Sequence, residues 1–124
     1  MLMDNFITSL RELRKDKNAI QRREHLLCEP QLSLDMVDEI HNLIPDRDTF
    51  LMVSIRVFSP RAFVGDRLNH NLRSRLARVL SMRKEYISTL IKIVIFRYDN
   101  VDGFKKKVNE AYAEIRNTVI EKNV

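Results

Sequence analysis

The stretch that decides the fold is RSRLARVLSMRKEYISTLIK, residues 73–92. Its apolar residues have the spacing of two short helices that cross steeply at a tight turn. Such a crossing leaves room for only a small side chain at the closest approach, where Ala77 lies, and it needs a branched apolar anchor on the second helix, where Ile87 lies. The rest of the predicted buried seam consists of Leu76, Leu80, Met82 and Leu90.

The positive charge of the chain is concentrated around this stretch. Residues 67–92 contain seven basic residues and one acidic residue, Glu85, a net charge of +6, whereas the whole chain of 124 residues carries +5. The remainder is therefore close to neutral, and Glu85 is the only acid near enough in sequence to pair with these cations. A local surface that is basic and mostly unpaired indicates a polyanionic partner.

Composition predicts one all-α domain over residues 1–124, a compact bundle of five or six helices with a long C-terminal helix. The lone Cys28 excludes an intrachain disulfide, and the first residues lack the features of a signal peptide, so we expect a cytoplasmic protein. The longest apolar runs are too short to cross a bilayer, and no membrane partner is expected.

Upstream, residues 1–58 are expected to form the N-terminal helices. A long amphipathic helix is expected to end before Pro30, and a short one with Ser33 as N-cap runs up to Pro45. A third helix is expected to be capped by Asp46 or Asp48. Its residues are apolar almost all round, which predicts that it is central and buried. A strand is the alternative for residues 50–58, as it is for residues 91–98.

Downstream of a loop that contains Asp66, Asn69 and His70, the helix-turn-helix is expected over residues 67–98 and the C-terminal helix over residues 101–122. Pro60 suits the first position of a helical turn that Gly65 would end. The C-terminal helix carries a seam that can close on the same chain or on a second copy, which would make a homodimer. That seam consists of Phe104, Val108, Ala111, Ile115 and Thr118.

Residues 73–92 resemble the helix-turn-helix DNA-binding superfamily of phage repressors and bacterial regulators. The resemblance implies that the second helix enters the major groove of double-stranded DNA and contacts it through its start and its outward face. The turn position that usually holds glycine, because its backbone has a positive φ, is occupied by Ser81. The order that begins at IPDRDTF, residues 44–50, also resembles region four of bacterial sigma factors, with a longer connection from Ser59 to Asn69.

The resemblance assigns each DNA-binding residue a role. On the second helix, Arg83 can pair with guanine and Glu85 can accept from cytosine. Ser88 and Thr89 suit a base or a phosphate, whereas Lys84 and Lys92 suit phosphates. On the first helix, at least some of Arg73, Arg75 and Arg78 are expected to face the DNA backbone.

We therefore expect a small transcriptional regulator of a phage or mobile element. The main alternative is a helical adaptor whose basic face binds an acidic protein, followed by an RNA-binding bundle, against which the shortage of stacking aromatics weighs. The chain has no motif of an enzyme, and nothing in it indicates a cofactor or a small-molecule substrate. His25, Cys28, His41 and His70 lack the paired spacing of a zinc site.

Overall fold

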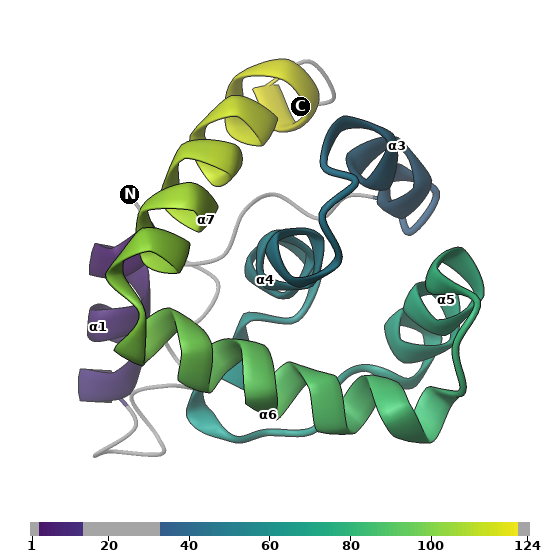
Figure 1. The fold of residues 1–124 in the computed structure, drawn as a ribbon, viewed down its shortest axis with the longest axis horizontal. Helices are drawn as coiled ribbons and strands as arrows, with labels where there is room; N and C mark the ends of the chain where they lie inside the picture. The colour runs from purple at the N-terminus through teal and green to yellow at the C-terminus, as the bar shows by residue number, and fades with distance from the viewer. Residues whose placement is uncertain (1–2, 14–32, 122–124) are drawn as a thin grey trace.

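The computed structural model describes residues 3–13 and 33–121, and within these ranges it contains six α-helices and no strand, which confirms the all-α prediction (Figure 1). The stretches 50–58 and 91–98 are both helical, so the strand alternative is wrong for each. The helices are α1 (Met3–Leu13), α3 (Met36–Leu43), α4 (Arg47–Phe58), α5 (His70–Leu80), α6 (Lys84–Asn100) and α7 (Asp102–Ile115). A 3₁₀ helix, η1 (Pro60–Val64), lies between α4 and α5, and a π-helical turn, η2 (Arg116–Ile120), follows α7.

Helix α4 is the centre of the fold. Figure 1 shows it end-on, with α6 passing along one side and α7, α3 and α5 placed around it. All nine residues from Thr49 to Val57 are buried, as expected for a helix that is apolar almost all round. The buried side chains of all six helices form one apolar cluster.

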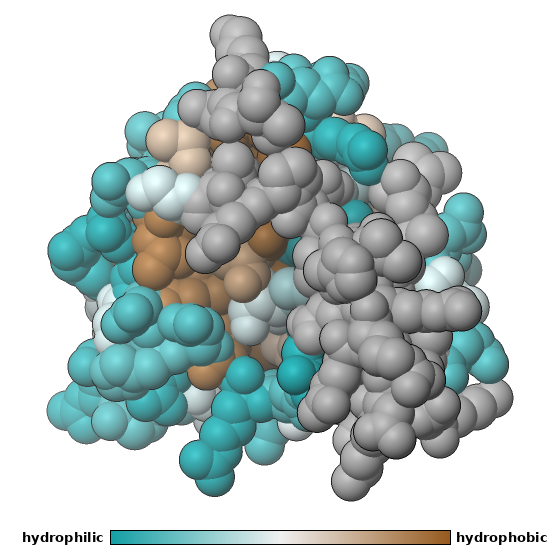
Figure 2. Space-filling view, turned by 180° about the vertical axis from the view of Figure 1, so that it is seen from behind, coloured by the Kyte–Doolittle hydropathy of each residue, from teal (hydrophilic) through white to brown (hydrophobic). Residues whose placement is uncertain are grey.

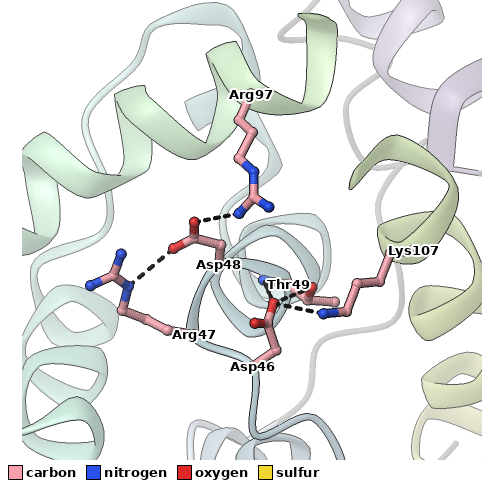
Figure 3. Close-up of polar contacts among 6 residues, drawn as sticks. All are labelled: Asp46, Arg47, Asp48, Thr49, Arg97 and Lys107. Atoms are coloured by element: carbon pink, nitrogen blue, oxygen red, sulfur yellow. Dashed lines mark hydrogen bonds and ion pairs between the residues drawn. The ribbon is translucent and has the colours of Figure 1, made fainter. Parts of the chain in front are cut away.

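Two acids at the start of α4 connect it to the helices that follow (Figure 3). Asp46 is the N-cap, and its carboxylate accepts hydrogen bonds from the Thr49 amide at 3.1 Å and from the Thr49 hydroxyl at 2.6 Å. Lys107 of α7 adds an ion pair to Asp46 at 3.5 Å. Asp48 accepts from Arg97 of α6 at 2.8 Å. The cap residue Asp46 therefore also contacts α7, and Asp48 next to it contacts α6.

The Asp46 contacts predict a pH dependence of stability. The hydrogen bond from the Thr49 side chain, helped by the Thr49 amide and Lys107, lowers the pKa of Asp46 from its ordinary 3.8 despite partial burial. The stabilisation is therefore complete above that ordinary value and is lost as the pH falls through the lowered one. Asp46→Asn should show a shallower loss of stability below about pH 4 in thermal melts across a pH series. The exposed Asp102→Asn is the control, and an unchanged slope for Asp46→Asn would contradict the prediction.

Arg56 of α4 lies at the centre of the core with 1% of its surface exposed. Its guanidinium carbon lies 3.6 Å from the ring centre of Phe6 on α1 and 4.9 Å from that of Tyr112 on α7. Contacts of a cation with the faces of aromatic rings offset part of the cost of burying the charge. This stack joins three helices that are far apart in sequence.

The start of α3 and the end of the C-terminal helix differ from the sequence expectation, whereas the far part of the first predicted helix is not tested. The described part of the first predicted helix is Met3–Leu13, and residues 14–32 lie outside the described ranges. Ser33 accepts from the Asp35 amide at 3.2 Å but precedes a turn, so α3 begins later, at Met36. In the C-terminal helix, Thr118 is exposed and bonds to the Glu114 carbonyl, while the π-turn places Val119 and Ile120 in the core.

The C-terminal seam closes on its own chain. Phe104, Val108 and Ile115 are buried, and α7 packs against α4 and α6. A homodimer through this seam thus loses its structural basis, because the apolar side chains that would form it are already covered.

Apolar side chains also reach the surface. The face seen from behind is hydrophilic around its margin and has apolar residues near its centre (Figure 2). On α6, the large apolar side chains of Tyr86, Ile93 and Phe96 are exposed. Among the described helices, none is both long and apolar enough to cross a membrane.

Candidate nucleic-acid interface

The turn between α5 and α6 has the backbone geometry that the sequence predicts. Ser81 adopts φ 55° and ψ 47° and is the only non-glycine residue with positive φ in the described ranges. The Ser81 amide donates to the Arg78 carbonyl at 3.2 Å and the Met82 amide to the Ala77 carbonyl at 2.8 Å, which closes the end of α5 in a Schellman arrangement. The left-handed conformation costs serine about 1 kcal/mol more than it would cost glycine.

The inner faces of α5 and α6 are locked together as predicted. Leu76 and Ile87 are completely buried, and Ala77 keeps 5% of its surface exposed. Leu90 is buried as well, while Leu80 and Met82 are partly buried and pack against the core. The direction of the outer face of α6 is therefore set by the core packing of the helix.

Helix α6 begins without a side-chain cap. Arg83 occupies the N-cap position, and no side chain in the described structure bonds to the first amides of the helix. The Tyr86 and Ile87 amides both donate to the Arg83 carbonyl, so the amides before them have no bond within the helix. Uncapped amides at the positive end of a helix are donors for an anion.

Six of the nine predicted DNA-binding residues are exposed around this helix start. Arg78 lies at the end of α5, Arg83 at the turn, and the others on the first part of α6. No ion pair to Arg78, Arg83, Lys84 or Lys92 occurs in the described part of the chain, which leaves their charges open to a partner. The six are Arg78, Arg83, Lys84, Glu85, Thr89 and Lys92.

Arg75 lies elsewhere. Its guanidinium pairs with Asp35 at 3.2 Å and with Asp38 at 3.3 Å, both close to or within α3. At least some of Arg73, Arg75 and Arg78 are expected to face the DNA backbone, and Arg75 is the one that two acids hold instead, 37 and 40 residues upstream. Sequence reasoning found only Glu85 because it considered nearby acids.

Arg73 and Ser88 turn toward one another. Arg73 Nη1 donates to Ser88 Oγ at 3.4 Å, and both side chains are partly buried. They lie at the rim of a cavity behind the exposed face of α6. This placement moves both residues from the centre of the predicted interface to its edge.

Two features of this region were not predicted from the sequence. Asn69 caps α5, because its Oδ1 accepts from the Asn71 and Leu72 amides at 2.9 and 3.4 Å, so His70 belongs to the helix. An asparagine directly before a helical pattern is the signal for this cap. The second feature is the exposed apolar side chains of Ile93 and Phe96, which follow Lys92 on α6.

The two histidines in the described ranges, His41 and His70, do not form a metal site with other side chains there. The ring of His41 stands edge-on to Phe50 with the ring centres 4.8 Å apart, and His70 starts α5. His25 and Cys28 lie outside the described residues. Within the described ranges, no three His, Cys, Asp or Glu side chains come together as metal ligands.

Comparison of the chain with protein-family models, with curated proteins and with solved structures finds no significant match.

Proposed function

We propose that the protein binds double-stranded DNA in a sequence-specific manner through the first half of α6. The observation that carries the proposal is the orientation of this half-helix. Ile87 and Leu90 hold its inner face in the core, while Arg83, Lys84 and Lys92 extend into solvent. A protruding helix with a basic outer face and a fixed inner face suits the major groove.

The contacts divide into base reading and backbone positioning. Arg83 lies at the tip of the helix, where its planar guanidinium can bond to guanine, and Glu85 can accept from cytosine. Lys84, Lys92 and Arg78 surround this tip and suit phosphates, as do the uncapped amides of α6. Thr89 lies on the outer face between these groups. Arg75 has no part in the proposed interface because α3 holds it.

We further propose that the protein acts in the cytoplasm as a transcriptional regulator of a phage or mobile element. Its small size and the exposed basic face at the start of α6 support this role. A single recognition helix contacts only a few base pairs. Specific binding would then depend on a repeated site or on other proteins bound to the DNA next to it.

The experiment is duplex binding by fluorescence anisotropy over a range of salt concentrations. Four exposed cations that replace counterions predict a loss of affinity of about a hundredfold between about 50 and about 200 mM salt. Enrichment of binding sites from a random duplex pool should then give one sequence pattern. A flat salt response, or a pool without enrichment, would contradict the proposal.

A second candidate is an adaptor that binds an acidic protein. It is favoured by Phe96 and Ile93, which are 69% and 50% exposed on the same helix as Lys92. A protein partner would cover these side chains, whereas a duplex bound at the first half of α6 has no need of them. Phe96→Ser should thus leave duplex affinity within about twofold, since phosphate and base contacts dominate DNA binding. A large loss would instead place Phe96 in the duplex interface and contradict this division of the helix between two partners.

A further inference from the structure

A cavity of about 570 Å³ lies behind the exposed face of α6. It opens between the loop that follows η1, the start of α5 and the middle of α6. Its volume is within the range of sites for small molecules, about 300–1,000 Å³. Leu68, Ile91 and Ile95 supply apolar lining, and polar lining comes from Arg67, Arg73 and Lys92.

The charges around the cavity are unbalanced. Arg67, Arg73 and Lys92 come from three different segments and form no ion pair within the described ranges. Asp66 is the only carboxylate in the lining, and Arg61 Nε binds it at 2.6 Å. The positive end of α5, which starts at His70 in the lining, adds to the potential. An anion is therefore the complement of this cavity.

Arg73 has hydrogen-bonding capacity to spare. Among the described residues, its buried Nε has no hydrogen-bond partner, and its Nη1 makes only the long 3.4 Å bond to Ser88. Because Nε is closed to solvent, a ligand in the cavity would bond to the terminal nitrogens of Arg73, where the only hydrogen bond within the described ranges is this long one. A guanidinium can bind a carboxylate or a phosphate with two parallel hydrogen bonds.

We propose that this cavity binds a small organic anion, with its phosphate or carboxylate on Arg73, Arg67 and Lys92 and an apolar group against Leu68 and Ile95. A phosphate of the DNA backbone shares the anionic chemistry but has no group for the apolar lining. This lining is the reason to assign the site to a small molecule.

The ligand would also regulate the proposed function, on which this second step rests. Lys92 belongs both to the cavity and to the outer face of α6. An anion in the cavity competes for Lys92 with the DNA phosphates and lowers the positive potential of the DNA-binding face. Occupation of the cavity thus weakens duplex binding.

The test measures the binding of phenyl phosphate to the full chain by calorimetry, without DNA. Inorganic phosphate and phenol are measured in the same way, because the first has only the anionic group and the second only the aromatic ring. Phenyl phosphate should bind at least about tenfold more tightly than either. Arg73→Gln should weaken it at least about tenfold, whereas Lys106→Gln, on the exposed face of α7, should not change it. Lys92→Gln, at an exposed position, serves as a second variant if melting shows that Arg73→Gln is unfolded.

Three results would overturn the site. The first is that phenyl phosphate fails to bind, and the second is that the cavity variants bind it like the wild type. The third is that inorganic phosphate binds equally well, which would show that the apolar lining contributes nothing and that the site does not select an organic anion. The regulatory step is tested separately, by duplex binding with saturating phenyl phosphate, where unchanged affinity would overturn that step. Because the probe is measured without DNA, failure of the site and failure of DNA binding are distinguishable.

Discussion

Replacement of Ala77 by glutamate is expected to abolish duplex binding and to destabilise the whole fold. Ala77 lies where α5 packs on α6, with 5% of its surface exposed and its carbonyl bonded to the Met82 amide across the turn. A longer side chain has no space there, and its charge would be buried among Leu76, Ile87 and Leu90. Burial of an unpaired charge costs about 3 kcal/mol or more, out of a typical total of about 5–15 kcal/mol.

The measurement is thermal unfolding followed by circular dichroism, together with duplex binding. Lys106→Gln is the matched control, because it changes the net charge by the same amount at an exposed position on α7. It should leave the melting temperature and the affinity close to those of the wild type. Equal effects of the two substitutions would show that the crossing of α5 and α6 does not control the interface.

Replacement of Arg83 by alanine is expected to reduce sequence discrimination. The base contact of a guanidinium contributes about 1–3 kcal/mol, so affinity for the selected site should fall about fivefold to about 150-fold, with a much smaller loss on random duplexes. Lys92→Ala should weaken binding to every duplex by a similar factor and lower the salt dependence by about one counterion. Binding isotherms on both kinds of duplex at several salt concentrations measure the difference.

Lys106→Ala provides the control for both variants, since it removes a cation from an exposed face outside the proposed interface. The roles of the two residues differ because Arg83 precedes the helix at its tip, whereas Lys92 lies more than two turns along it. The same fall on selected and random duplexes for Arg83→Ala would remove it from base recognition.

Much of the fold could be predicted because its signals are local. The spacing of apolar residues located α4, α5 and α6, and an acid directly before α4 located its cap. The position of Ser81 between two apolar patterns predicted its left-handed backbone, although the residue type did not favour it. Each of these features depends only on residues that are close together in the sequence.

The missed features depend on contacts between distant parts of the chain. The ion pairs of Arg75 with Asp35 and Asp38 require α3 to pack beside α5. The turn of Arg73 toward Ser88 requires the cavity between α5 and α6. A one-residue shift in the C-terminal helix follows from the π-turn after Ile115, which a 3.6-residue period cannot predict.

Helix α6 is continuous from Lys84 to Asn100, a length of about 25 Å. Its exposed start and its far end therefore belong to one rigid element. The far end is anchored, because Tyr98 bonds to Asn109 of α7 and Arg97 bonds to Asp48 of α4. A graft of residues 84–92 alone onto a foreign scaffold would be expected to lose this orientation, because the contacts of Arg97 and Tyr98 that anchor the helix lie in its other half.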